Sequence, residues 1–464
     1  MCGGKKDKNN KWNINGHKDR IVYYNEERLR VIADALEEGA DWNSVKLPSI
    51  YVQEVVDVLE KFSFFKTHLS NYNCIISEGL HEVGSVDKGI MKRFTSYPQL
   101  DKYEMIYSGP HFYVGNPFYK SPRKECILNS DYDTVNTTSI SDNFIPRTNY
   151  IPININEEYK HQVKGFYIKQ NPDGTPEYDS WIDYYKMGFR RMIGSDSERT
   201  LSGAILLPKT MHIGGVVSVT FKNYWHLCEF ASLSSSIPLD FYVKTLKITD
   251  IHANRLLPFP MGIDKKYKVA LYSRILQLNC LTMAYFDLWQ SCWRPEYAQE
   301  EWSLSDPRLK PFTGLTEEWT WDTPLRNYFE RRQALVEIDV LAAMALGLSL
   351  KDLELIYTIQ FPVLQQNEND TWYDAKGNIV FTCSSGLKGV GCERKEWEAI
   401  RGSLSEDGIT YEGTAPTYVH TIDPKKSEMY GGEEVTYYAP YNKCDRIADY
   451  RRAWAFFEKK YNME

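Results

Sequence analysis

Residues 184–208 read YYKMGFRRMIGSDSERTLSGAILLP, and this stretch decides the fold that we expect for the middle of the chain. The apolar run 201–207 has the length of a buried strand and ends at a proline. A polar turn, 194–197, comes before the run, and two adjacent arginines, Arg190 and Arg191, come before the turn. The pattern predicts a sheet with arginines at its edge, where a phosphate or a base can be contacted; a charged surface turn is the alternative.

The composition is that of a globular protein with several domains. The chain has 464 residues, of which 42% are hydrophobic and 14% aromatic, which is ample for packed cores. Its 33 tyrosines and 12 tryptophans exclude a disordered protein. The formal net charge is −7, so any DNA contact must use local basic patches on an acidic background.

No segment is typical of export or membrane insertion. No apolar run reaches the ~18 residues that a membrane helix needs, and no secretory signal pattern is visible. We therefore expect a cytoplasmic protein without a membrane partner. The nine cysteines include no C-x-x-C pair and no histidine at zinc spacing, so reduced thiols and no metal site are expected.

Hydrophobic periodicity predicts a mixed α/β (α+β) fold with helical C-terminal segments. Short strands are expected over 71–150, a loop over 151–177, and Ser349 is a predicted N-cap. Three parts are expected: an N-terminal α/β segment (1–155), a core (156–350) and a C-terminal α+β segment (351–464). The remaining expected elements are helices over 26–39, 49–65, 236–247, 267–293, 324–348, 348–364 and 445–461, and strands over 22–25, 204–208, 214–221 and a hairpin over 371–381.

Three segments in this order carry a resemblance to a known family: RRMIGSDSERTLSGAILLP (190–208), SLSSSIPLDFYVKTLKITDIHANRLLPFP (232–260) and RRQALVEIDVLAAMALGLSLKDLELIYTIQFPVL (331–364). Upstream segments that add to it are WNINGHKDRIVYY (12–24), SGPHFYVGNPFYKSPRKE (108–125) and FIPRTNY (144–150). Together they resemble the C-terminal, DNA-recognising half of type IIG-like restriction–modification adenine methyltransferases, including DISARM-like phage-defence members. The resemblance covers nearly the whole chain and makes 156–350 the target-recognition core.

The resemblance implies sequence-specific recognition of duplex DNA as part of an N6-adenine DNA methyltransferase. In that family a catalytic half binds S-adenosylmethionine at a Gly-rich turn after a strand, and Asn-Pro-Pro-Tyr/Phe holds the flipped adenine. This chain lacks the Gly-rich turn, and its nearest match to the second motif, GNPFY at 115–119, is one proline short. We therefore expect no complete Rossmann methyltransferase domain, no catalytic residue and no cofactor here. S-adenosylmethionine is expected on a methyltransferase catalytic domain or subunit, either a separate polypeptide or a part lost by truncation.

The first candidate DNA-binding residues lie in a Pro-bounded loop that combines cations with an aromatic side chain. Such a loop can hold phosphates and stack on an exposed base, although a solvated loop has the same composition. These candidates are Tyr119, Lys120, Arg123 and Lys124.

Two further groups of candidates follow along the chain. Arg147 and Asn149 lie between two prolines and are the side chain types suited to guanine and adenine, although Arg147 could instead pair with an acid. The other group can hold phosphate oxygens through guanidinium groups, hydroxyls and turn amides, although Glu198 and Arg199 could form a salt bridge that holds the fold. This group is Arg190, Arg191, Ser195, Arg199 and Thr200.

Two alternative functions stay open at this point. The chain could be a divergent S-adenosylmethionine-dependent DNA methyltransferase that uses Asn116, which would bind that cofactor by itself. It could also be an acidic interaction or decoy protein that binds a methyltransferase and no DNA, consistent with its net charge of −7.

Overall fold

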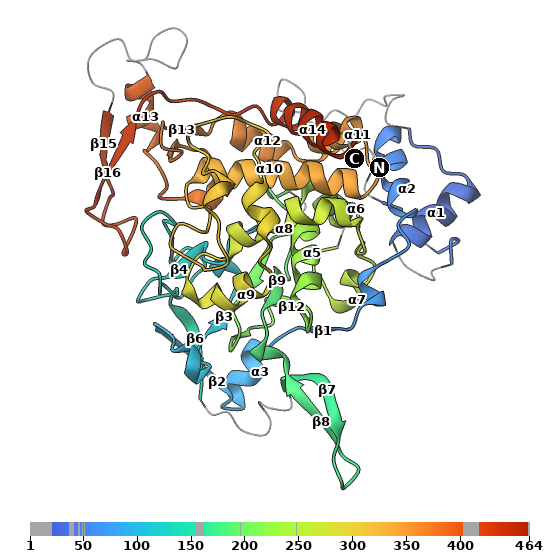
Figure 1. Ribbon diagram of the computed structural model, residues 1–464. Helices are drawn as coiled ribbons and strands as arrows, with labels where there is room; N and C mark the ends of the chain where they lie inside the picture. The colour runs from blue at the N-terminus through green and yellow to red at the C-terminus, as the bar shows by residue number, and fades with distance from the viewer. Residues whose placement is uncertain are drawn as a thin grey trace.

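The structure is a computed structural model, and it describes residues 21–36, 41–44, 47–48, 50, 52–153, 159, 162–194, 196–246, 248–401 and 417–462. Figure 1 shows a mixed α/β fold, as the sequence predicts, with a helical upper layer and small sheets below and to one side. In the described part of the chain the sheets are separate and none closes into a barrel.

The stretch 184–208 supplies the two neighbouring strands β9 (Lys186–Arg190) and β10 (Gly203–Leu206). They belong to a four-stranded sheet of order β1-β12-β9-β10, completed by β1 (Cys74–Ser77) and β12 (Val216–Phe221). Every neighbouring pair is antiparallel, and all residues of β10 and β12 are buried. The predicted strands over 204–208 and 214–221 are therefore confirmed.

Two glycines allow the strands of this sheet to approach closely. A Cβ on Gly188 would lie 2.4 Å from Cδ1 of Leu206, and a Cβ on Gly203 would lie 2.6 Å from Cδ1 of Phe189. Real Cβ atoms do not come so close to other carbons, so any other residue at either position would force the neighbouring side chains or the strands to shift.

Helices pack on the sheet in successive layers. Helix α5 (Tyr224–Ser234) contacts β9, β10 and β12, α8 (Lys265–Asn279) contacts α5, and α10 (Tyr328–Ala345) contacts α8. Helices α11 (Leu350–Gln360) and α14 (Arg446–Asn462) then pack on α10. Because α10 has neighbours on both sides, even its charged side chains are largely buried.

Side-chain caps explain where two of these helices begin. Asn327 accepts a hydrogen bond from the backbone of Glu330, whose carboxylate accepts one from the backbone of Asn327 in return. Ser349 and Asp352 form the same reciprocal pair at the start of α11, so the predicted N-cap is confirmed.

The structure differs from the predicted elements in four places. The predicted helix 348–364 is divided between α11, which ends at Gln360, and α12 (Pro362–Asn369). The predicted loop 151–177 contains most of a hairpin, β7 (Lys164–Gln170) and β8 (Pro176–Ser180), which projects from the body in Figure 1. The predicted helix 267–293 is two helices, since α8 ends at Asn279 and α9 covers Phe286–Ser291. No strand forms over the described residues 22–25, which lead directly into α1 (Glu26–Leu36).

The other elements are short and surround the central sheet. The paired strands are β2 (Met91–Ser96) with β6 (Thr148–Pro152), β3 (Ile106–Tyr107) with β11 (Met211–His212), β4 (Lys120–Pro122) with β5 (Tyr132–Thr134), β13 (Trp372–Tyr373) with β14 (Ile379–Phe381), and β15 (Thr417–Thr421) with β16 (Glu434–Tyr438). The remaining α-helices are α2 (Gln53–Phe62), α3 (Glu82–Asp87), α6 (Ile237–Thr245), α7 (Ala253–Leu256), α12 (Pro362–Asn369) and α13 (Arg394–Arg401). Short 3-10 turns cover Leu69–Asn71, Leu100–Lys102, Gly109–His111, Trp181–Asp183, Met283–Tyr285, Pro295–Gln299, Phe312–Gly314 and Ser385–Leu387.

One hydrophobic core joins most of the chain. It runs from Ile32 to Phe457 and takes side chains from all three predicted parts, with the sheet and helices α5, α8 and α10 at its centre. Smaller cores lie under β2 and β6 and under the hairpin β13–β14. Among the helices that the structure describes, none is both long and apolar enough to cross a bilayer.

Candidate functional site

A cavity of about 540 Å³ lies where the three predicted parts meet. Its wall comes from the loop 110–120, from the connection between β9 and β10 (190–202), from α10, and from the C-terminal segment 364–387. The cavity has the size of a small-molecule site, for which volumes of roughly 300–1,000 Å³ are typical. It brings together five predicted site residues from two distant segments: Tyr119, Lys120, Arg190, Arg199 and Thr200.

Two stacked tyrosines form one side of the cavity. The rings of Tyr113 and Tyr119 lie 5.1 Å apart at an interplanar angle of 27°. The tight turn between them, where Gly115 has a φ of +60°, brings the rings together, and the Tyr113 amide donates to the Asn116 carbonyl. The Tyr119 hydroxyl donates to the carbonyl of Gly386, which ties this loop to the C-terminal segment. Burial raises the pKa of both phenols, so both stay neutral.

Arg190 lies over both tyrosine rings. Its guanidinium carbon is 5.2 Å from the Tyr113 centroid and 5.8 Å from the Tyr119 centroid. Nε and Nη2 donate to the carbonyls of Gly109 and Phe112 at 2.8 and 2.7 Å, so the side chain is fixed while its charge is not neutralised. Burial lowers the pKa of Arg190, although an arginine stays charged at neutral pH.

Lys120 adds a second cation beside Arg190. Its Nζ lies 5.0 Å from the centre of the Tyr119 ring, and among the described residues it donates to no acceptor and pairs with no carboxylate. Burial, then the neighbouring charges of Arg190 and Lys388, lower the pKa of Lys120 to about 8. A desolvated ammonium next to a guanidinium is unfavourable alone and attracts an anion.

Arg331, from α10, is a third cation without a carboxylate partner in the described part of the chain. Its guanidinium donates only to backbone carbonyls, those of Leu278, Leu325 and Gly115, at 2.8–3.1 Å. Burial lowers its pKa to about 10. These bonds hold the 110–120 loop against α10, so Arg331 both shapes the cavity and adds positive charge to its wall.

Glu198 lines the cavity, and no salt bridge joins its carboxylate to a cation in the described part of the chain. Its Oε2 accepts hydrogen bonds from Asn367 Nδ2 at 2.7 Å and from Ser384 Oγ at 2.9 Å. Oε1 has no hydrogen-bond partner among the described residues, and burial raises the pKa of the carboxyl group. Glu198 therefore presents one free oxygen in the wall of the cavity.

Arg199 is held by Asp240 and not by its sequence neighbour Glu198, so the salt bridge left open as an alternative for Glu198 and Arg199 does not form. Arg199 Nε lies 2.5 Å from Asp240 Oδ2, and both side chains are almost completely buried. Asp240 also accepts from the backbone amides of Thr200 and Leu201 at 3.0 and 2.9 Å. Asp240 belongs to α6, so its ion pair with Arg199 and its two hydrogen bonds join α6 to the segment that leads into β10.

The wall also holds buried polar atoms without a partner. Thr200 is 4% exposed, and its Oγ1 makes no hydrogen bond with any described residue. Arg332 is 7% exposed, and its Nη2 is free although its other nitrogens pair with Glu368 and Asp449. Unpaired buried polar groups are uncommon and costly, so these two atoms of the cavity wall are available to a ligand or to a water molecule.

Arg123 and Arg147 lie outside this cavity, in a cluster of ion pairs. Arg123 pairs with the buried Asp133 at 2.9 Å, and Arg147 pairs with Glu428 at 2.5 Å. Glu428 also accepts from the backbone amide of Lys124, whose side chain is exposed. The alternative left open for Arg147, that it pairs with an acid, is thus what the structure has.

The remaining predicted residues are dispersed. Asn149 is buried in β6, where its Oδ1 accepts from Thr95 at 3.0 Å. Arg191 points away from the cavity wall, toward Glu78 and Asp250, at 4.0 and 3.6 Å. Ser195 falls outside the described residues.

The described residues do not fit the S-adenosylmethionine site of a methyltransferase. The parallel strands among them are β3 and β11, which pair over two residues only, so no doubly wound parallel sheet is formed there. Asn116 lines the cavity, but its Oδ1 accepts from the amide of Phe118 within its own turn.

Within the described ranges, Cys392, Glu396 and His420 are close enough to share a metal ion. However, Glu396 already accepts from His420 at 2.9 Å and from Tyr418 at 2.6 Å, so the carboxylate and the imidazole satisfy each other. The local geometry is explained without an ion.

Several cavity residues were missed by the sequence reasoning. Tyr113 could have been found, since it and Tyr119 flank the Gly115–Pro117 turn at equal positions. The others come from α10 and from the C-terminal segment, and no local pattern marks them: Arg331, Arg332, Asn367 and Ser384. Comparison with models of known protein families and with curated proteins finds no match to this chain.

Proposed function

We propose that this chain recognises a specific sequence of duplex DNA as part of a cytoplasmic restriction–modification or phage-defence N6-adenine methyltransferase. The observation that carries the proposal is the convergence of Tyr119, Lys120 and Arg190, from two segments of the family resemblance, on one cavity with unneutralised positive charge. The partner is a methyltransferase catalytic domain or subunit. That partner would bind S-adenosylmethionine and act on the adenine.

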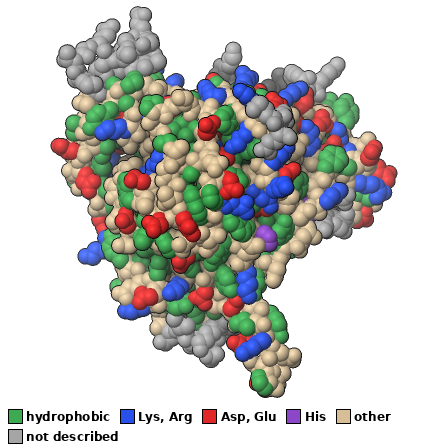
Figure 2. Space-filling model, viewed as in Figure 1, with side chains coloured by type: hydrophobic (Ala, Val, Ile, Leu, Met, Phe, Trp, Pro, Cys, Tyr) green, Lys and Arg blue, Asp and Glu red, His purple; other side chains and the backbone are tan. Residues whose placement is uncertain are grey.

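The charge distribution supports a local contact with DNA. In Figure 2, basic and acidic side chains are interspersed over the visible face, so no broad basic surface is seen there and a contact with DNA would be local. The partly buried Lys120, in the cavity wall, and the exposed Lys388 carry charges that repel each other. Two ammonium groups so placed can contact neighbouring phosphates, while the cavity behind them offers hydrogen-bonding groups for specificity.

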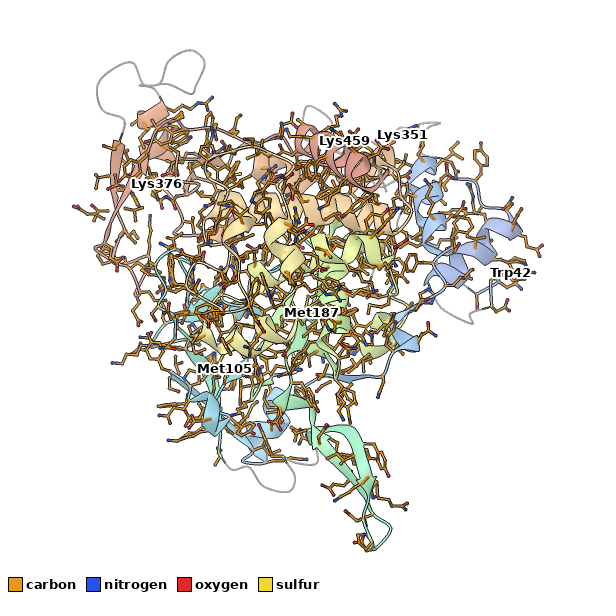
Figure 3. All side chains as sticks on the ribbon, in the orientation of Figure 1. Trp42, Met105, Met187, Lys351, Lys376 and Lys459 are labelled. Atoms are coloured by element: carbon orange, nitrogen blue, oxygen red, sulfur yellow. The ribbon has the colours of Figure 1, made fainter. Side chains whose placement is uncertain are left out.

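Fluorescence anisotropy with a labelled duplex of random sequence, titrated at several salt concentrations, tests the proposal. Each of Lys120→Met and Lys388→Met should lower the slope of log K against log salt by about 1, because each removes one phosphate contact. Lys351→Met on α11 and Lys459→Met on α14 are matched controls, since both lysines are exposed, lie outside the cavity wall and are labelled in Figure 3.

The control variants should keep the wild-type slope. Binding of no duplex at low salt would refute the proposal and favour the acidic decoy protein. Equal losses in all four variants would mean that the DNA contact is diffuse and does not involve the cavity. Once binding is found, selection from a random duplex pool gives the recognised sequence.

A further inference from the structure

We propose that the cavity binds a single nucleotide, with its phosphate between Lys120 and Arg190 and its base at the side formed by Glu198 and Asn367. This inference goes beyond the proposed function, because a free nucleotide can bind there whether or not the chain binds duplex DNA. The shared chemistry is a purine or pyrimidine joined to a phosphate. Its source is either an extrahelical nucleotide of DNA or a free nucleoside monophosphate.

The phosphate position follows from the unpaired cations. Lys120 has no acceptor for its ammonium group among the described residues, and the Nη1 of Arg190 makes no hydrogen bond while Nε and Nη2 are held by carbonyls. A guanidinium with one free nitrogen beside a lysine can supply the donors that a phosphate needs. The anion would offset the cost of holding these two cations together out of water.

The base position follows from the other polar groups of the wall. Glu198 offers a free Oε1, and Asn367 and Ser384 fix the orientation of its carboxyl group. A carboxylate accepts hydrogen bonds from the exocyclic amino groups of adenine, cytosine or guanine, whereas thymine has no such group. Glu198 and Arg190 line the same cavity as Tyr113 and Tyr119, so the position of the base and the position of the phosphate belong to one site.

The size and the lining of the cavity agree with this ligand. Four tyrosines line it, namely Tyr113, Tyr119, Tyr328 and Tyr373, together with aliphatic side chains, which suits a flat heterocycle better than a bare ion. The unpartnered Oγ1 of Thr200 and Nη2 of Arg332 are further donors available to the phosphate or the sugar.

Isothermal titration calorimetry with the whole chain tests the inference, using dAMP, dCMP, dGMP, dTMP, deoxyadenosine and inorganic phosphate. At least one of the three amino-bearing nucleotides should bind about tenfold or more tightly than dTMP, than deoxyadenosine and than phosphate. Lys120→Met should weaken binding about tenfold or more, and Glu198→Gln should reduce the preference over dTMP. Lys459→Met is the control, and thermal unfolding of each variant verifies folding.

The pH dependence gives an independent readout. Because the pKa of Lys120 is lowered to about 8, nucleotide affinity should fall as the pH is raised from 7 to 9, and this fall should be absent in Lys120→Met. A merely structural lysine would leave the pH profile of binding unchanged.

Competition with DNA distinguishes the two sources of the nucleotide. If a duplex with one unpaired nucleotide displaces the bound mononucleotide and a fully paired duplex does not, the site takes an extrahelical nucleotide. If neither displaces it, the site takes the free compound. Two results would each refute the inference. The first is equal affinity for inorganic phosphate and for nucleotides. The second is no binding of any nucleotide together with no preference for the duplex with one unpaired nucleotide over the fully paired duplex. Loss of duplex binding alone would refute only the proposed function.

Discussion

Replacing Arg199 by methionine should destabilise the fold without acting on nucleic-acid binding directly. Arg199 Nε lies 2.5 Å from Asp240 Oδ2, and its Nη2 donates to the carbonyl of Ser235 at 2.9 Å. The methionine would leave the carboxylate of Asp240 buried, with the amides of Thr200 and Leu201 as its remaining partners among the described residues. The perturbation therefore creates an uncompensated charge between α6 and the central sheet.

The expected loss of stability is large. Removing one partner of a buried ion pair costs about 3–5 kcal/mol. Two lost hydrogen bonds to a charged group, at about 1.5–3 kcal/mol each, give a similar figure. The total stability of a folded protein is about 5–15 kcal/mol, so the variant would lose a substantial fraction of it.

Urea unfolding followed by tryptophan fluorescence measures this loss. Arg191→Met is the matched control: Arg191 is half-buried, its acids lie at 3.6 and 4.0 Å, and such pairs contribute about 0.2–1 kcal/mol. Arg199→Lys keeps the charge and should recover part of the stability. The reasoning is refuted if Arg199→Met unfolds at the wild-type urea concentration yet loses DNA or nucleotide binding, because Arg199 would then act on a ligand.

Three further predictions concern other buried groups. Burial lowers the pKa of Lys186 to about 7 from 10.5, so the unfolded chain binds more protons than the folded chain between these pH values. The free energy of unfolding should therefore rise from pH 7 to pH 9. Urea unfolding at both pH values should show this rise in the wild type and not in Lys186→Met. The carboxylate of Asp133 pairs with Arg123 and accepts hydrogen bonds from the amides of Glu428 and Met429, and Asp133→Asn removes its charge. The amides of the 426–430 segment should then exchange with deuterium about tenfold or more faster. Unchanged exchange would contradict this role. Ser349→Ala removes the N-cap of α11 and should cost about 0.5–2 kcal/mol by urea unfolding, while Ser349→Asp should cost less.

The helices and buried strands were predictable wherever a local pattern specifies them. The cap at Ser349, the apolar run of β10 and the helical C-terminus depend on residues within one or two turns of each other. The end of α8 does not depend on nearby residues alone. The side chain of Asn279 donates to the carbonyl of Ile275 and accepts from the amide of Ile205 in the sheet. A contact with a strand 74 residues away stops this helix, and the sequence around it stays apolar.

The hairpin β7–β8 was missed for a different reason. Both of its faces are largely exposed, so it lacks the alternation of apolar and polar residues on which strand prediction rests. Its turn was nevertheless visible as Asn171-Pro-Asp-Gly174, where Gly174 adopts a φ of +83° and the Asn171 and Thr175 backbones pair. Turn residues were a better guide than hydrophobic pattern in this exposed segment.

The cavity shows why residue type alone does not separate a binding arginine from a structural one. Arg190 and Arg199 flank the same polar turn, and in sequence either could hold a phosphate. Folding brings Asp240, 41 residues further along, against Arg199, whereas the groups that reach Arg190 are carbonyls and tyrosine rings. Arg199 is therefore neutralised inside the protein, whereas Arg190 pairs with no carboxylate among the described residues and keeps a charge that an incoming anion can compensate. The variant pair Arg190→Met and Arg199→Met should separate accordingly, with the first losing mainly affinity for ligand and the second losing mainly stability.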